Sequence, residues 1–116
     1  MKYKFFMIYN HFKSCIDACL ECVAICNQCA VACLNEKDTE HLKRCIELDL
    51  DCATVCRSTV ELMSRSSSFA DSYCRLCADV CAACAEECER HAAMHDHCRL
   101  CAEACRRCAD ACMAMA

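Results

Sequence analysis

Apolar positions recur along most of this chain at alternating steps of three and four residues. Side chains at these steps lie on one face of an α-helix, and polar residues occupy the other positions. The pattern predicts four helices, over about residues 12–34, 39–64, 69–90 and 96–114. Because the connections are short, consecutive helices are expected to run antiparallel. The predicted fold class is all-α: an antiparallel up-down-up-down four-helix bundle, formed by residues 1–116 as a single domain.

Three of the predicted helices start near residues that can cap them. Asp38 or Thr39 precedes the second helix, and Asp96 can begin the fourth. Ser68, followed by Asp71, resembles a capping box ahead of the third helix. The chain contains no glycine and no proline, which supply the tight turns of sandwiches, barrels and phosphate-binding loops. Composition therefore favours helices as well.

The apolar face of these helices consists largely of cysteine. The chain has 19 cysteines among its 116 residues, so a continuous stripe of thiols replaces the leucines that bundles normally carry. The second helix has the fewest, and its register also reaches Asp49, Thr59 and Met63. The cysteines are Cys15, Cys19, Cys22, Cys26, Cys29, Cys33, Cys45, Cys52, Cys56, Cys74, Cys77, Cys81, Cys84, Cys88, Cys98, Cys101, Cys105, Cys108 and Cys112.

So many interior thiols need a chemical reason, because a smaller core side chain that leaves a cavity costs roughly 2 to 5 kcal/mol per site. A disulfide scaffold is disfavoured, since neighbouring thiols on one helix point in similar directions and the cysteine count is odd. A thiol oxidoreductase needs a partly exposed cysteine of low pKa at a helix start, whereas these CxxC pairs lie within helices. We therefore predict a metal-binding protein that is not an enzyme.

The ligand type indicates which metal. Thiolates select soft Cu(I), which accepts low coordination numbers, so two thiolates three or four residues apart can hold one ion. If each thiolate bridges two ions, the ratio approaches one Cu(I) per cysteine, and the charges balance. Multiple Cu(I) ions are therefore the predicted cargo. The alternative is a metallothionein-like zinc or cadmium sequestration protein, with fewer ions in tetrahedral thiolate sites.

The order and spacing of the cysteines resemble the cytosolic four-helix-bundle copper storage proteins of bacteria, over about residues 14–112. The most specific stretches are SCIDACLECVAICNQCAVACL, RCIELDLDCATVCR, FADSYCRLCADVCAACAEECERH and HCRLCAEACRRCADAC. This resemblance implies a homotetramer of bundles, each storing many Cu(I) ions along its interior for copper homeostasis. It also places all 19 cysteines at positions similar to the family's ligands. Copper donor or acceptor proteins are possible partners.

Histidines gather near two of the connections. The first and third connections of such a bundle lie at the same end, which brings together His41, His91, His95 and His97, with Met94 among them. Imidazole and thioether both suit copper, so this end is a candidate mouth for metal uptake, with His91, His95 and His97 as its main residues. Solvated loop histidines without a role are the alternative.

Residues 1–11 form an aromatic N-terminal extension that the family does not usually show. Tyr3, Phe5, Phe6, Tyr9 and Phe12 are five of the seven aromatic residues in the chain. They are expected to plug one mouth of the bundle or to pack between subunits. The apolar run of residues 5–9 is shorter than the roughly 7 to 15 residues of a signal-peptide core.

Charge and hydropathy indicate where the protein works. No stretch has the roughly 18 uninterrupted apolar residues of a membrane span, so we expect a cytoplasmic protein with no membrane partner. The net charge of −4 and the lack of a clustered basic patch argue against nucleic acid as a partner. Expected to be solvated surface are Glu21, Glu36, Glu47, Glu86, Glu87, Arg106 and Arg107.

Overall fold

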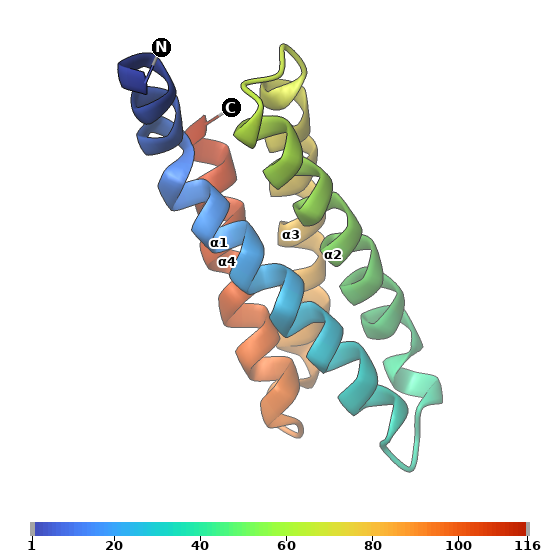
Figure 1. The fold of residues 1–116 in the computed structure, drawn as a ribbon. Helices are drawn as coiled ribbons and strands as arrows, with labels where there is room; N and C mark the ends of the chain where they lie inside the picture. Colours follow the sequence, from blue (N-terminus) through green and yellow to red (C-terminus); the bar gives the residue numbers. More distant parts are fainter. Residues whose placement is uncertain (1, 116) are drawn as a thin grey trace.

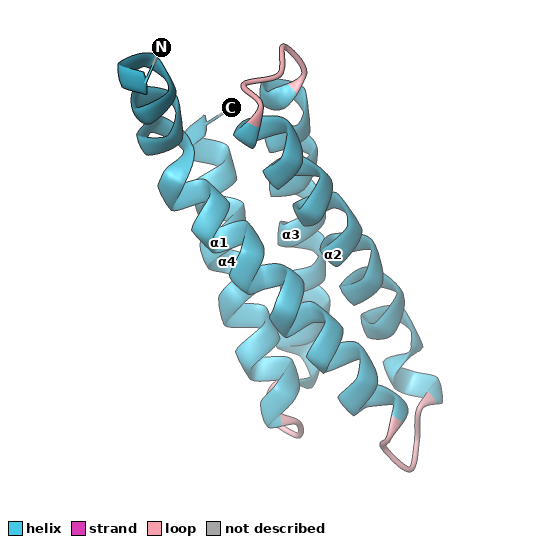
Figure 2. Ribbon diagram, viewed as in Figure 1, coloured by secondary structure: helices cyan, strands magenta, loops and turns pink. Residues whose placement is uncertain are grey.

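The computed structural model describes residues 2–115, with side chains described for residues 11–115. Its helices are α1 (Lys2–Leu34), α2 (Lys43–Ser64), α3 (Ala70–His91) and α4 (Asp96–Met115), and a short 3₁₀ helix, η1 (Glu40–Leu42), precedes α2. Residues 2–115 contain no strand (Figure 2). The predicted all-α class is confirmed.

The four helices form an elongated antiparallel bundle (Figure 1). Helix α1 packs against α2 and α4, and α3 packs against the same two helices. The molecule measures 54 × 20 × 18 Å. The connections α1–α2 and α3–α4 lie at one end, while the α2–α3 connection and the described chain ends lie at the other (Figure 1). The predicted up-down-up-down topology is therefore confirmed, including the shared end of the first and third connections.

Helix α1 begins at Lys2, ten residues before its predicted start. The sequence before residue 12 contains neither glycine nor proline, so no residue there interrupts the helix. The side chains of Tyr3, Phe5 and the other extension aromatics before residue 11 lie outside the described side chains, so their predicted packing stays a prediction. Phe12 is partly buried against the core.

Two predicted helix caps are wrong. Thr39 directly precedes η1 but makes no side-chain cap hydrogen bond. The residue that directly precedes α3 is Phe69 rather than Ser68, and it makes no such bond either. The Phe69 N–H instead donates to Oγ of Ser67, at 3.1 Å, so Ser67 orders this turn in place of Ser68. The prediction that Asp96 begins the fourth helix is confirmed.

Helix α2 ends in a Schellman motif without a glycine. Ser66 takes the left-handed conformation, with φ of 51°. The N–H groups of Ser67 and Ser66 donate to the carbonyl oxygens of Leu62 and Met63, at 2.9 and 3.0 Å. These bonds satisfy the last carbonyls of α2 and reverse the chain toward α3.

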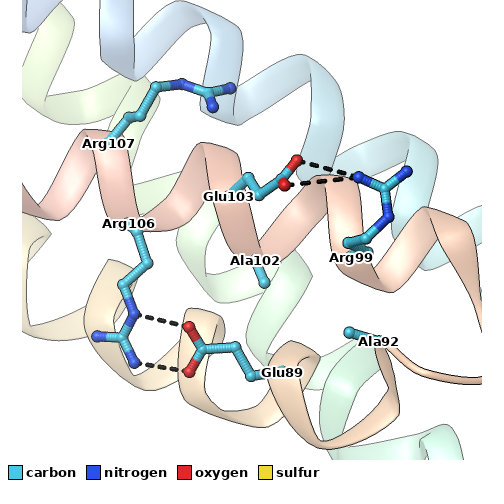
Figure 3. A pocket seen from close by; sticks show the side chains of 7 residues that line it. All are labelled: Glu89, Ala92, Arg99, Ala102, Glu103, Arg106 and Arg107. Atoms are coloured by element: carbon cyan, nitrogen blue, oxygen red, sulfur yellow. Dashed lines mark hydrogen bonds and ion pairs between the residues drawn. The ribbon is translucent and has the colours of Figure 1, made fainter.

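Ion pairs on the surface join α4 to both of its neighbours. Arg106 donates two hydrogen bonds, of 2.8 and 2.9 Å, to Glu89 of α3 (Figure 3). Arg107 pairs with Glu21 of α1. Because these side chains are half exposed, each pair contributes at most about 1 kcal/mol. Glu21, Arg106 and Arg107 were expected to be plain surface. They remain solvated, but they also link helices.

Candidate metal-binding core

All 19 cysteines face the interior of the bundle, and none has more than 1% of its surface exposed. All are free thiols. Their spacing of three and four residues keeps each stripe on the helix face that points toward the bundle axis. Cysteine sulfur atoms therefore line the interior along the bundle, as the periodicity predicts.

Sulfur atoms from neighbouring helices lie in contact inside the bundle. The Sγ atoms of Cys45 and Cys88 are 3.4 Å apart, as are those of Cys52 and Cys81. A metal bound about 2.3 Å from each of two sulfurs separates them by no more than about 4.6 Å. Pairs at these distances can hold one ion between them with small side-chain movements.

The thiols also form overlapping groups of four. Cys19, Cys56, Cys77 and Cys108 come from the four different helices, and their sulfur atoms all lie within 4.8 Å of one another. Neighbouring groups share members, so a thiolate can bridge ions in adjacent groups. Further groups of this kind are Cys22, Cys52, Cys56 and Cys81; Cys22, Cys26, Cys52 and Cys105; Cys26, Cys84, Cys101 and Cys105; and Cys29, Cys33, Cys45 and Cys98.

Burial opposes ionisation of these thiols. It raises the pKa of Cys74 to about 12, and together with the neighbouring Cys45 it raises the pKa of Cys33 to about 12. Such thiols are neutral at physiological pH until a cation displaces their protons. A monovalent ion per thiolate cancels the buried charge that results, which an empty thiolate core could not tolerate.

One carboxyl group lies inside the sulfur core. Asp49 is fully buried, and its Oδ1 accepts hydrogen bonds from the thiols of Cys101, Cys84 and Cys88, at 3.2, 3.3 and 3.7 Å. Burial, with a further contribution from Cys101 and Cys45, raises the pKa of Asp49 to about 9. Asp49 is therefore a neutral acid at physiological pH.

Helix α2 contributes no thiol near the end of the bundle that holds the chain termini. Thr59 and Met63 take those interior positions, and both are fully buried. The Thr59 hydroxyl donates to the carbonyl oxygen of Val55 at 2.7 Å, which satisfies it within its own helix. At this end, cysteines from three helices rather than four thus line the interior.

The four histidines gather at the opposite end. Ring centroids lie 5.4 Å apart for His41 and His91, 6.2 Å for His41 and His95, and 5.2 Å for His95 and His97. They come from η1, the last residue of α3, the α3–α4 turn and the first turn of α4. The two connections at this end therefore bring together the histidines that the sequence placed there.

His97 lies at the boundary between the histidines and the sulfur core. Its Nε2 is buried and has no hydrogen-bond partner among the described residues. The ring lines a cavity of about 130 Å³ together with Cys29, Ile25, Gln28 and Leu100. An imidazole nitrogen without a partner, beside a thiol of the core, is available as a metal ligand.

Two histidines are held by carboxylates that were expected to be solvated surface. Nε2 of His91 lies 2.8 Å from Oε2 of Glu87, and the two side chains are only 13% and 12% exposed. Nδ1 of His95 lies 3.5 Å from Oε1 of Glu36, which is 38% exposed. The surface assignment is wrong for Glu87. Its spacing of four residues from His91, which puts both on one helix face, is the signal that could have revealed the pair.

Within α1, residues His11–Leu34 are long and apolar enough to cross a membrane by length and composition alone. Of the most apolar part of this stretch, 39% is buried inside the bundle. The apolar character comes largely from six cysteines, all of which face the core. We therefore interpret this stretch as a core helix of the bundle.

Comparisons with known proteins agree with this geometry. Residues 8–116 match the family described as Csp, copper storage protein. The cysteine-rich protein YhjQ of Bacillus subtilis (strain 168) is 46% identical over 88 residues, which are 76% of this chain and 80% of that protein. The structure of Cu(I)-bound copper storage protein BsCsp3 matches with a TM-score of 0.86 and 46% identity, covering 90% of this chain and 97% of that one.

A second solved structure shows copper loading, with five coppers, in a cytosolic copper storage protein from Streptomyces lividans. It matches with a TM-score of 0.90 and 44% identity, and the match covers 94% of each chain. Nearly the whole described bundle thus has counterparts of the same fold. The chain belongs to the copper storage protein family.

Proposed function

We propose that this protein stores Cu(I) ions in its interior, bound by cysteine thiolates, in the cytoplasm. The observation that carries the proposal is the array of 19 buried, free cysteines along the bundle interior. The Cu(I)-bound and cytosolic relatives support both the ion and the compartment. The proposed role is that of a container, with no catalysed reaction at the bound ions.

We assign all 19 cysteines as copper ligands, at about one ion per cysteine. The overlap of the four-sulfur groups supports this ratio, because a shared thiolate counts toward two ions. Charge balance supports it as well, since each Cu(I) replaces one thiol proton and leaves the core neutral. The same number of zinc or cadmium ions would leave a large positive charge in a buried core, so sequestration of divalent ions is the weaker proposal.

Anaerobic titration of the reduced, copper-free protein with Cu(I), in competition with a strong chelator, tests this function. We expect saturation near 19 ions per chain. Protein whose thiols have been alkylated is the control and should take up almost none. Saturation at four ions or fewer, which is the capacity of separate four-thiolate sites, would contradict the proposal.

We propose that copper reaches the core through the histidine end, at His91, His95 and His97. His41 is the most exposed of the four imidazoles in contact there, with 48% of its side chain exposed. His91 and His95 lie deeper, with 13% and 14% of their side chains exposed. His97 follows, beside Cys29 of the sulfur array. Imidazole contacts thus run from the solvent to the first thiols, and a copper donor or acceptor protein would dock at this end.

We also propose that the bundles assemble as homotetramers. Apolar side chains remain on the outside, among them Leu20 (51% exposed), Val31 (59%), Leu34 (59%) and Leu100 (49%). Because the interior is filled by sulfur, these side chains can be buried only between subunits. Light scattering of the copper-free protein should give four times the chain mass of 13.0 kDa. A mass equal to that of one chain would contradict this assembly.

A further inference from the structure

Glu87 makes a contact that distinguishes it from the other glutamates of α3. Its Oε2 lies 2.8 Å from Nε2 of His91, and both side chains are nearly buried. Oε1 faces Nη1 of Arg90 at 3.7 Å, so the two carboxylate oxygens have different partners. A carboxylate can only accept a hydrogen bond, and therefore Nε2 of His91 carries the ring proton.

The position of that proton decides which nitrogen of His91 can bind metal. With the proton on Nε2, the lone pair lies on Nδ1. We propose that Glu87 is a positioning residue, which holds the His91 ring so that Nδ1 is presented to an incoming Cu(I) ion. This inference rests on the proposed storage function. Histidines that bind metals commonly donate their other nitrogen to a carboxylate, which fixes the ring and makes the ligand nitrogen more basic.

The other carboxylates near the histidines hold their rings less firmly. Asp38 lies 3.2 Å from Nδ1 of His41, but these side chains are 72% and 48% exposed. Glu36 lies farther, 3.5 Å from Nδ1 of His95. The Glu87–His91 contact is both the shortest and the least exposed of the three. His91 is therefore the imidazole whose orientation is set before copper arrives.

The test measures how fast Cu(I) moves from a chelator to the reduced, copper-free protein, by stopped-flow absorbance. Glu87→Ala should slow the transfer of the first equivalents roughly tenfold, the usual effect of removing such a carboxylate. Glu87→Gln should fall between this variant and the natural protein, because an amide oxygen still accepts from Nε2. The matched control is Glu86→Ala, which removes the exposed neighbour on the same helix and should change nothing. Total copper capacity should be the same in all of them.

A spectroscopic measurement separates positioning from a merely structural role. Long-range ¹H–¹⁵N NMR spectra of the copper-free protein should show His91 protonated on Nε2. In Glu87→Ala the ring should populate both tautomers, whereas a loss of stability alone would leave the tautomer unchanged. Protonation of His91 on Nδ1 in the natural protein would overturn the proposal.

His91→Ala distinguishes failure of this inference from failure of the storage function. If His91→Ala or Glu87→Ala loads as fast as Glu86→Ala while capacity stays near 19 ions, the positioning role is wrong and storage stands. If the natural protein itself takes up four ions or fewer, the storage function fails first. Slow loading by both His91→Ala and Glu87→Ala, at full capacity, supports the proposal.

Discussion

Copper loading is expected to raise the unfolding temperature of this protein by roughly 30 °C or more. A ligand that binds only the folded chain stabilises it by about 4 kcal/mol for each site filled at a thousand times its dissociation constant. Two such sites contribute about 8 kcal/mol, which is comparable to the entire stability of a typical domain. An array that uses 19 thiols holds many more ions than two.

The effect is large because the empty core is poorly suited to hold the helices together by itself. Cysteine side chains are small, and thiols of this core lie 3.4 to 4.0 Å from one another in pairs such as Cys45 with Cys88 and Cys29 with Cys33. An ion between sulfurs of two helices replaces such a contact with two metal–thiolate bonds. Metal bridges between neighbouring helices therefore cross-link the bundle along its length.

Circular dichroism at 222 nm, recorded anaerobically during heating, measures this shift. The samples are the reduced protein without copper, the protein loaded to saturation, and the loaded protein after copper is removed by a chelator. The third sample should return to the unfolding temperature of the first. Equal unfolding temperatures for the loaded and copper-free protein would place the copper outside the core.

The fold could be predicted from the sequence because its periodicity leaves few alternatives. Steps of three and four, without glycine or proline, give four helices whose thiol stripes can face only one another. The helix starts were harder to predict. Ser67 orders the turn before α3 because Ser66, just after α2, takes the left-handed conformation, and side-chain patterns do not report such backbone geometry. Helix α1 extends to Lys2 because the helical spacing of its apolar residues continues before Cys15, the first cysteine.

The burial of the candidate ligands was predictable, and the contacts of the groups around them were less so. The same periodicity buries all 19 cysteines, and the short connections bring the histidines together. The proposed role of Glu87 depends on its burial at the bundle end. That a charged helix residue is buried cannot be read from its identity alone. Asp49 was visible on the sulfur stripe, but the three thiols that donate to its Oδ1 come from α3 and α4, far away in the sequence.

Replacing Asp49 by asparagine is expected to stabilise the copper-free protein at pH 8, although most changes to a buried, hydrogen-bonded residue destabilise. Folding at pH 8 forces the carboxyl group to take up a proton, because its pKa rises from about 4 in the unfolded chain to about 9 in the core. That protonation costs on the order of several kcal/mol. Asparagine needs no proton, and its amide oxygen can still accept hydrogen bonds from Cys84 and Cys101.

The sign of the pH dependence follows from the same shift. Between pH 4 and 9 the folded state binds one more proton at Asp49 than the unfolded state does, so this residue makes the protein less stable as the pH rises. Its contribution is most favourable below about pH 4 and is fully lost above about pH 9. Asp49→Asn should therefore be more stable than the natural protein at pH 8 and nearly equal to it near pH 4.

Urea unfolding of the reduced, copper-free protein at pH 5 and pH 8, at one fixed protein concentration, checks both statements. The natural protein should lose more stability than Asp49→Asn when the pH is raised from 5 to 8. Asp51→Asn is the matched control, because it removes an exposed carboxylate two residues along the same helix and should leave the pH dependence as it is. If Asp49→Asn has the same pH dependence as Asp51→Asn, the core accommodates Asp49 as an ion, and the thiols around it then serve as donors to a buried charge.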